Sequence, residues 1–361
     1  MLKARKAASK GDKVLFFLPL GLSLFGLLAI FDTSSVSALR NFGDSFHYVK
    51  NQSLWLFLGF LLFLFFSFID YKSLKKLALP LFVVSLLGLV LVLIPGVGKE
   101  VYGGKRWLFF GSFNLQPSEF AKFALVVYLS TLFEKKREFF PFLTILGLVL
   151  ILVVLEPDLG TAMVLVCTSF GLYFIAGAPI SQLLITTLIS LIVLPCLIIF
   201  SYYRRQRLIT FLTSSFTAEK ASYHVKQILI ALGSGGIFGR GFGQSRQKFL
   251  FLPEVTTDSI FAIIGEEFGF IGAVILILVL FFLVYRSFRL ALLTKDPFAR
   301  LLVSGIALGL GLQILVNLGA MVVLIPLTGI PLPFISYGGS SLLICLSEAG
   351  IVYNISRRVI N

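Results

Sequence analysis

Charged side chains are scarce in this sequence. Asp, Glu, Lys and Arg together make up 13% of the 361 residues, whereas hydrophobic side chains make up 58%. A soluble domain carries about twice this share of charge. The composition therefore excludes a soluble globular protein and predicts a chain that lies in a lipid bilayer over most of its length.

Cysteine and histidine are also rare, and their positions exclude several kinds of chemistry. Cys167, Cys196 and Cys345 all lie in apolar segments, so no extracytoplasmic disulfide framework is expected. His47 and His224 are far apart, which argues against a histidine-based metal site. The sequence also lacks the motifs of phosphate-binding loops, dinucleotide-binding folds and serine hydrolases. We expect no nucleic-acid partner.

Long apolar runs account for most of the chain. A transmembrane helix needs about 20 consecutive apolar residues. Six runs are uncharged and meet this length, and four others carry isolated charges or are slightly short. They predict an all-α polytopic membrane protein, one domain over residues 1–361, with about ten transmembrane helices at 14–31, 51–69, 77–98, 118–133, 139–155, 159–180, 180–203, 259–285, 301–327 and 341–356.

The distribution of Lys and Arg predicts the orientation in the membrane. With ten helices both termini lie on one side, and the short segments on that side carry 17 Lys and Arg residues. The short segments on the other side carry five. Because short cytoplasmic segments are enriched in positive charge, we expect both termini to be cytoplasmic and the protein to span the cytoplasmic membrane several times.

Residues 203–257, between the seventh and eighth predicted helices, form a long basic loop. Its net charge is +6, yet the alternation of helices places it outside the cytoplasm. Long loops cross the membrane largely regardless of charge. Two interpretations remain open: a solvated loop attracted to anionic lipid head groups, or a cationic bed for substrate phosphate oxygens. The second makes candidates of the basic residues Arg204, Arg205, Arg207, Lys226, Arg240 and Lys248.

A charged motif precedes and enters the fourth predicted helix. Lys105 and Arg106 lie beside Trp107, and Glu119 and Lys122 are three residues apart, on one helix face. Charged residues within a membrane are costly and are functional candidates by default, so all four are candidate substrate-binding residues. The alternatives are interfacial anchoring for the first two and a structural ion pair for the last two.

Two carboxylates, Glu156 and Asp158, lie in a short turn before the sixth predicted helix. Carboxylate oxygens bind hard divalent cations, so this pair is a candidate site for Mg²⁺ or Mn²⁺. Aspartate is also a common N-cap residue, so Asp158 fits the start of a helix equally well. Both interpretations stay open.

Two segments rich in glycine or proline lie among these motifs. Residues 233–245 are glycine-rich, which suits a phosphate-binding turn but is a weak signal. Residues 329–341 combine proline and glycine at membrane depth, where irregular backbone is tolerated only if it is buried in protein or lines a cavity. Their Ser336 and Ser340 are candidate substrate-binding residues.

Asp258 ends the segment 252–258 and precedes a long hydrophobic run. A carboxylate at the boundary between water and lipid needs a function or a partner. Because this one follows a long basic loop, we expect chemistry on a lipid-linked anionic substrate. Glu254 in the same segment and Gln227 in the basic loop are further substrate-binding candidates.

Together these motifs resemble the SEDS family of membrane proteins (shape, elongation, division and sporulation), which includes FtsW, RodA and SpoVE. The resemblance lies in residues 105–122, 156–162, 233–245, 252–272 and 329–341, whereas the first hundred residues agree only in hydropathy. Residues 243–254 are closer to FtsW and SpoVE than to RodA. The family's essential aspartate corresponds to Asp258, but where relatives often have His-Thr-Asp-Phe this chain has Thr-Thr-Asp-Ser.

The resemblance implies a peptidoglycan glycosyltransferase that polymerises lipid II on the outer face of the cytoplasmic membrane. Glycosyl transfer to a sugar hydroxyl needs a base to take its proton, and we expect Asp258 to be that general base. It also implies a class B penicillin-binding protein as partner, together with other membrane proteins of the divisome or elongasome. Two alternatives remain: a transporter (flippase) of the lipid-linked precursor, and a non-catalytic scaffold. A transporter needs charges deep in several helices, for which Glu266, Glu267 and Glu348 are the main candidates.

Overall fold

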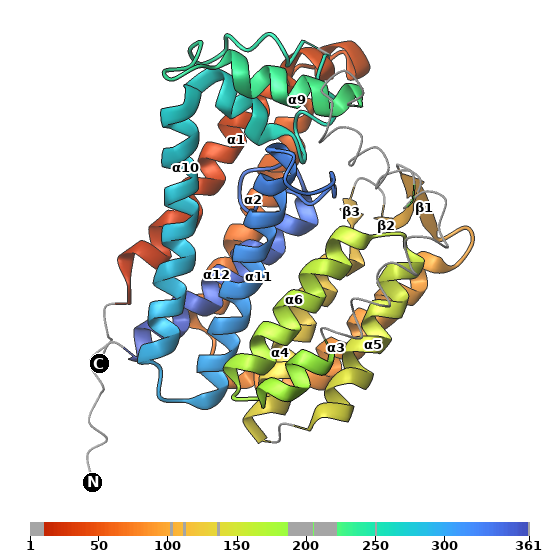
Figure 1. The fold of residues 1–361 in the computed structure, drawn as a ribbon, viewed down its shortest axis with the longest axis vertical. Coiled ribbons are helices and arrows are strands. Elements are labelled where there is room, and N and C mark those ends of the chain that lie inside the picture. The colour runs from red at the N-terminus through yellow and green to blue at the C-terminus, as the bar shows by residue number, and fades with distance from the viewer. Residues whose placement is uncertain are drawn as a thin grey trace.

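The chain folds into a bundle of long helices with a short helix and a small sheet at one end (Figure 1). The computed structural model describes residues 11–101, 104–110, 113–135, 138–186, 205, 222–249 and 251–359. Its helices are α1 (Lys13–Phe42), α2 (His47–Phe68), α3 (Lys72–Leu93), α4 (Pro117–Lys135), α5 (Phe139–Leu155), α6 (Leu159–Ile175), α9 (Tyr223–Ser234), α10 (Ile260–Leu293), α11 (Pro297–Met321) and α12 (Gly339–Val359).

The helices agree with the predicted spans wherever the structure describes them. Among the described residues, nine of the ten predicted spans coincide with a helix, and the span 180–203 is described only up to residue 186. In the part of the chain that the structure describes, five helices, α1, α2, α3, α10 and α11, are long and apolar enough to cross a membrane, and α5 and α6 are shorter apolar helices. The predicted helical, polytopic fold is confirmed, and the number of ten spans stays a prediction.

A three-stranded antiparallel sheet between α3 and α4 is an element that the all-α prediction lacks. The strands β1 (Gly98–Val101), β2 (Gly104–Phe110) and β3 (Phe113–Leu115) pair in the order β1-β2-β3. The register places Leu108 of β2 opposite Gly98 on one side and Leu115 on the other. Strands this short depend on their partners for stability, and their own sequences therefore carry no clear signal.

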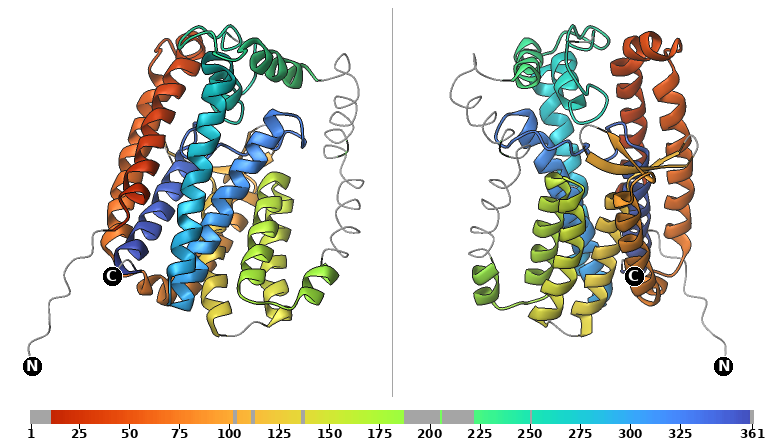
Figure 2. Two further views of the ribbon diagram at one scale, coloured as in Figure 1. Left: turned by 60° about the vertical axis from the view of Figure 1, so that its left-hand side comes forward. Right: turned by 90° about the vertical axis from the view of Figure 1, so that its right-hand side faces the viewer.

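The two ends of the bundle differ in character. The start of α1 and the end of α12 lie together, and the backbone N–H of Asp12 donates to the Ser356 hydroxyl at 3.1 Å. The opposite end carries the sheet, α9 and the segment between α11 and α12 (Figure 2). The start of α1 and the end of α12 therefore share one side of the molecule, and the polar motifs of the sequence gather at the other.

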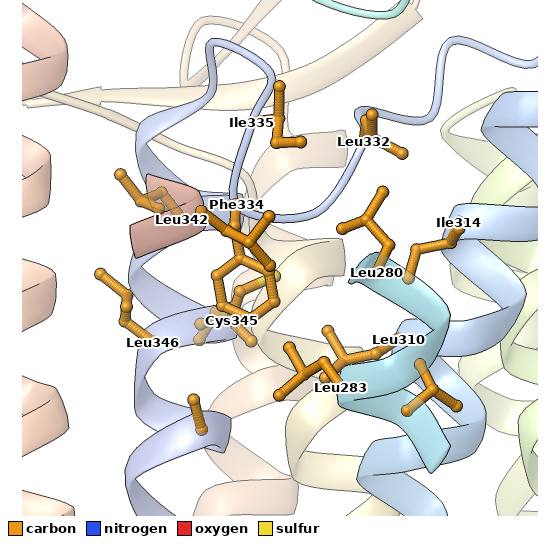
Figure 3. Close-up of a cluster of buried hydrophobic side chains, with 14 of the residues drawn as sticks. Leu280, Leu283, Leu310, Ile314, Leu332, Phe334, Ile335, Leu342, Cys345 and Leu346 are labelled. Atoms are coloured by element: carbon orange, nitrogen blue, oxygen red, sulfur yellow. The ribbon is translucent and has the colours of Figure 1, made fainter. Parts of the chain in front are cut away.

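The segment between α11 and α12 is part of the hydrophobic core. Figure 3 shows its Leu332, Phe334 and Ile335 among side chains of α10, α11 and α12, and none of the three is more than 3% exposed. A Cβ atom on Gly26 of α1 would lie 2.6 Å from the carbonyl oxygen of Phe334, so α1 passes directly against this segment. The proline- and glycine-rich backbone is thus buried in protein in part, and other residues of the segment line a cavity, as predicted for irregular backbone at membrane depth.

Helix α10 is kinked at Gly269, whose φ of +69° is non-helical. The glycine-rich segment 233–245 forms backbone hydrogen bonds with α10 at this kink. The N–H groups of Arg240 and Gly241 donate to the carbonyl oxygens of Glu266 and Glu267, at 3.1 and 2.9 Å, and the freed N–H of residue 270 donates to residue 236 at 2.9 Å. Buried backbone groups need such partners, so this segment completes the hydrogen bonding of a broken helix.

Candidate active site

A cavity of about 1030 Å³ lies at the end of the bundle that is opposite the termini. Its wall combines residues of the sheet, of α4, α6 and α9, of the turn before α10 and of the segment after α11. Six predicted site residues line it: Arg106, Glu119, Asp158, Lys248, Glu254 and Asp258. Seven lie outside the lining: Lys105, Lys122, Glu156, Gln227, Arg240, Ser336 and Ser340. The cavity thus unites motifs that are up to 152 positions apart in the sequence, from Arg106 to Asp258.

Asp258 is 9% exposed and is held in a turn that is bonded from two other elements. The carbonyl oxygens of residues 256, 257 and 258 accept hydrogen bonds, in that order, from the backbone N–H of Tyr337 at 2.8 Å, the Ser336 hydroxyl at 2.5 Å and the Asn317 amide at 2.9 Å. Ser336 therefore positions the turn that carries Asp258, whereas the sequence analysis predicted that it binds substrate.

Glu254 also shapes this turn. Its φ of +52° lies in the left-handed region, which a non-glycine residue adopts only when its surroundings enforce it. Its carbonyl oxygen accepts from the N–H groups of Thr257 and Ser259 at 3.2 and 3.1 Å, and its carboxylate accepts from the Thr257 hydroxyl at 2.9 Å. The same hydroxyl lies 3.2 Å from Oδ1 of Asp258. Glu254 is thus linked to the Asp258 carboxylate through one intervening hydroxyl.

Arg106 bridges the sheet to the turn before α6. Its guanidinium donates to the carbonyl oxygens of Glu156 at 3.0 Å and of Pro157 at 2.5 Å. Pro157 has a φ of +27°, so the two hydrogen bonds from Arg106 stabilise a strained turn. Arg106 lines the cavity, but two of its N–H donors are used in these hydrogen bonds to backbone carbonyl groups. Lys105, its neighbour in β2, pairs across the sheet with Glu100 in the strand register.

Glu119 and Lys122 form the predicted ion pair in α4, with a distance of 2.7 Å between Nζ and Oε1. Both side chains are buried, and Lys122 also donates to Oε1 of Gln313 in α11 at 2.7 Å. Glu119 lines the cavity, whereas Lys122 lies behind it. The pair therefore joins the cavity wall to the centre of the bundle.

The candidate cation site at Glu156 and Asp158 does not fit a metal. Asp158 is the N-cap of α6: it accepts from the backbone N–H of Thr161 at 3.1 Å and from the Thr161 hydroxyl at 2.9 Å. Within the described residues there is no cluster of three Asp, Glu, His or Cys side chains that suits a metal ion. The positive charge of Arg106 next to the turn also opposes a cation. We therefore derive no chemical step through this pair, and the predicted need for Mg²⁺ or Mn²⁺ stays a prediction.

The burial of the Glu156 carboxyl group predicts that the stability of the fold depends on pH. Neither of its oxygens has a hydrogen-bond partner among the described residues. Burial, and after it the charge of Asp158, raise the pKa of Glu156 from 4.5 to about 9, against a smaller lowering by Arg106. A carboxyl whose pKa is higher in the folded state stabilises the fold below the unfolded pKa and loses this contribution as the pH rises through the folded pKa.

We expect Glu156→Gln to raise the melting temperature at pH 9 and to leave it unchanged near pH 4.5, because the amide cannot ionise. Thermal unfolding of both proteins in detergent across this pH range measures the effect. Melting curves that stay parallel at every pH would contradict the buried-carboxyl interpretation.

Lys248 is the centre of a buried ion cluster. Its Nζ lies 2.6 Å from Oδ1 of Asp32 in α1 and 3.0 Å from Oε1 of Glu267 in α10. The neighbouring Glu266 accepts from the Ser245 hydroxyl at 2.5 Å. Lys248 touches the cavity, yet its charge is shared by two carboxylates. Lys248 thus ties the loop to α1 and α10, and its predicted contact with phosphate stays a prediction.

We therefore expect Lys248→Met to destabilise the fold by about 3–5 kcal/mol, because it leaves two buried carboxylates without their cation. Arg246→Met is the matched control, since the Arg246 side chain is exposed in the same segment. Thermal unfolding in detergent separates the two variants. A Lys248→Met protein of normal stability with a weakened affinity for substrate would instead favour the predicted phosphate contact.

The remaining predicted residues lie outside the cavity. Arg240 is 3.7 Å from Glu266 and donates to the carbonyl oxygen of Ser234 at 3.3 Å. Ser340 accepts from the backbone N–H of Gln116 at 3.0 Å, which ties α12 to the start of α4. Gln227 lies on α9. The predicted contacts at Arg204 and Arg207 fall outside the described residues.

Three residues of the site escaped the sequence analysis. Asn317 anchors the Asp258 carbonyl, Asp32 pairs with Lys248, and His224 lines the cavity. Asn317 and Asp32 are polar residues within predicted or flanking apolar runs, which is a usable signal. His224 was set aside as a metal ligand because no second histidine lies near it in the sequence, although a catalytic cavity also uses single histidines.

Comparison with known proteins agrees with this architecture. Residues 12–360 match the sequence profile of the FtsW, RodA and SpoVE family, described as cell cycle proteins. The chain is 37% identical to the probable peptidoglycan glycosyltransferase FtsW of Geobacter sp. (strain M18), over 96% of this chain and 97% of that protein. It is 38% identical to stage V sporulation protein E of Bacillus subtilis (strain 168), over 96% and 97%.

Two solved structures are similar over nearly the whole chain. One belongs to work on the structural coordination of polymerization and crosslinking by a peptidoglycan synthase complex, with a TM-score of 0.79, 30% identity and coverage of 97% and 98%. The other is the rod shape determining protein RodA of Thermus thermophilus, with a TM-score of 0.72, 31% identity and coverage of 98% of each chain. The similarity extends through the first hundred residues, where the sequence motifs gave no support. The chain belongs to the FtsW, RodA and SpoVE family.

Proposed function

We propose that this multi-pass protein of the cytoplasmic (inner) membrane is a peptidoglycan glycosyltransferase that polymerises lipid II into glycan strands at the outer membrane face. The observation that carries the proposal is Asp258, held at the wall of a cavity of about 1030 Å³ at the end of the bundle opposite the termini. Relatives over nearly the full length of the chain bear the name peptidoglycan glycosyltransferase. The cavity has room for the sugars of a lipid-linked substrate, and the bundle below it is apolar.

The proposed chemistry is a single displacement at a sugar carbon. A hydroxyl of the acceptor sugar loses its proton to the Asp258 carboxylate and attacks the anomeric carbon of the donor. The bond between that carbon and the diphosphate oxygen breaks, and the lipid diphosphate leaves with the electron pair. Diphosphate leaves without being protonated, so one carboxylate is enough for inversion, in contrast to inverting glycosidases that need two.

The proposed source of positive charge for the diphosphate is Arg106 of β2, and a contribution from the basic loop stays a prediction. Arg106 and Lys248 line the cavity but are engaged by backbone carbonyls and carboxylates. The unshared donors of the Arg106 guanidinium remain suited to a phosphate oxygen. A requirement for Mg²⁺ or Mn²⁺ belongs to the proposal, and chelation by EDTA tests it.

The proposed partner is a class B penicillin-binding protein, which cross-links the glycan, within the divisome or elongasome. The support is the similarity to a protein from a synthase complex that coordinates polymerization and crosslinking. The pairing of Glu267, one of the transporter candidates, with Lys248 favours a fixed enzyme scaffold over a transporter at this position. Glu119 pairs with Lys122, and Lys248 pairs with Asp32 and Glu267.

The deciding experiment is polymerisation of purified lipid II by the purified protein, alone and with its transpeptidase partner. We expect glycan strands of many disaccharides, at a higher rate with the partner. Movement of a labelled lipid-linked precursor across liposome membranes, without any polymer in either assay, would support the transporter instead.

A further inference from the structure

His224 lies in the wall of the cavity and contacts the residue next to Asp258. It is the second residue of α9, and its Nε2 atom lies 2.8 Å from the hydroxyl oxygen of Ser259. Ser259 follows Asp258 directly and is fully buried. One side-chain hydrogen bond therefore connects α9 to the turn that carries the proposed base.

The Ser259 hydroxyl does no capping work in its own helix. Ser259 is the N-cap residue of α10, but its side chain makes no capping hydrogen bond. An N-cap serine ordinarily accepts a hydrogen bond from the second or third N–H of its helix, which stabilises the helix. Here the hydroxyl is engaged by His224 instead. Because the Ser259 hydroxyl does not cap α10, its role in the structure is the hydrogen bond to His224 of α9.

Helix α9 is a firm support for the imidazole. Val225, Ile228 and Ala231 recur at intervals of three residues and are buried, and α9 contacts α10 and α11. The Ser222 side chain caps the start of the helix by accepting from the Val225 N–H. Figure 1 shows α9 across the end of the bundle next to the start of α10. His224 therefore projects from a packed helix, within the first turn after its cap.

We propose that His224 is a positioning residue for Asp258: its imidazole holds Ser259 and fixes the catalytic turn from the side of α9. The carbonyl groups of residues 256–258 are already bonded from α11 and from the segment after it. His224 adds a contact from a third element, on the residue that joins the turn to α10. The inference rests on the proposed function, because it concerns the placement of the general base.

Placement matters because a general base acts only within hydrogen-bond distance of the hydroxyl that it deprotonates. A displacement of about 1 Å is enough to reduce a rate by about 100-fold. Loss of one of several contacts moves the turn less than that. We therefore expect His224→Ala to lower kcat for lipid II polymerisation by about tenfold, with little change in KM, because the cavity that binds the substrate persists.

The test compares five variants of the full-length protein: His224→Ala, His224→Gln, Ser259→Ala, the double variant His224→Ala with Ser259→Ala, and Tyr223→Ala as control. The Tyr223 side chain is 56% exposed and lies outside the cavity lining. Glutamine places an amide nitrogen near the position of Nε2, so His224→Gln keeps the contact without a titratable ring. We expect it to retain most of the wild-type rate and the shape of the pH–rate profile.

We expect Ser259→Ala to lower kcat as much as His224→Ala, and the double variant to be no slower than either, because both changes remove the same bond. Losses that multiply in the double variant would overturn the proposal. So would a His224→Gln protein as slow as His224→Ala with one limb of its pH profile missing, since the imidazole would then exchange protons itself. An equal loss in Tyr223→Ala would assign the effect to α9 as a whole.

The positioning role is also measurable without activity. A double-mutant cycle on thermal stability with His224→Gln, His224→Ala and Ser259→Ala reports whether the two side chains interact. We expect the shifts in melting temperature of His224→Ala and Ser259→Ala to be non-additive in the double variant. We expect His224→Gln alone to leave the melting temperature unchanged. Additive shifts would overturn the contact itself. A wild-type protein that makes no polymer would contradict the proposed function, and the stability cycle would still decide on the contact.

Discussion

Asp258→Asn is expected to reduce lipid II polymerisation by at least about 100-fold, because an amide cannot accept the proton of the acceptor hydroxyl and general bases contribute about 10²–10⁴-fold. The fold should persist. Asn317 and Ser336 hold the turn through backbone carbonyls, which the substitution leaves in place. The measurement is the initial rate of glycan formation from purified lipid II in detergent, with thermal unfolding as a check on folding.

Asp44→Asn is the matched control for this variant. Asp44 lies between α1 and α2 and forms an ion pair with Lys50 in which both side chains are exposed, and it does not line the cavity. The same chemical change at Asp44 should leave the rate unaltered. Asp258→Glu keeps a carboxylate but moves it by one methylene group, so an intermediate rate is expected. Normal polymerisation by a folded Asp258→Asn protein would remove Asp258 from the role of base.

The second large effect concerns the ion pair of Glu119 and Lys122. Both side chains are at most 10% exposed and their charged atoms are 2.7 Å apart. Removal of one partner leaves an uncompensated buried charge, which costs about 3–5 kcal/mol. We therefore expect Glu119→Gln and Lys122→Met each to lower the melting temperature strongly. The double variant should be more stable than the sum of the two losses predicts, since it leaves no charge behind.

Activity of the double variant distinguishes two roles of this pair. Glu119 lines the cavity, whereas Lys122 lies behind it and also bonds Gln313. If the pair is purely structural, polymerisation should recover together with stability. If the Glu119 carboxylate also binds substrate, stability should recover while KM for lipid II stays high. The exposed pair of Lys50 and Asp44 is the control, with an expected coupling of at most about 1 kcal/mol. Additive losses for Glu119 and Lys122 would show that the two side chains do not interact.

The functional centre was predictable from sequence where a charged residue lies next to the membrane interior, which is energetically costly. A carboxylate next to a long apolar run requires an explanation from sequence alone, and Asp258 does line the cavity. The same argument identified Glu119 and Lys122, whose spacing of three residues on a helix already implies contact. For Ser336 and Lys248 the structure shows contacts that the sequence did not reveal, because their partners come from other parts of the chain. Lys248 pairs with Asp32, 216 positions away, and Ser336 bonds the Thr257 carbonyl, 79 positions away.

The sequence by itself determined the helical, polytopic fold and the family, and it predicts the orientation in the membrane and Asp258 as the base. These follow from the length of apolar runs, from the distribution of Lys and Arg, and from short motifs, all of which are local properties. Only the tertiary structure decided which polar residues face the cavity and which hold it together. The small sheet, the hydrogen bonds at the kink of α10 and the contact of His224 with Ser259 each depend on polar groups from separate segments of the chain. A buried polar group must find a partner, but its own sequence does not say where that partner lies.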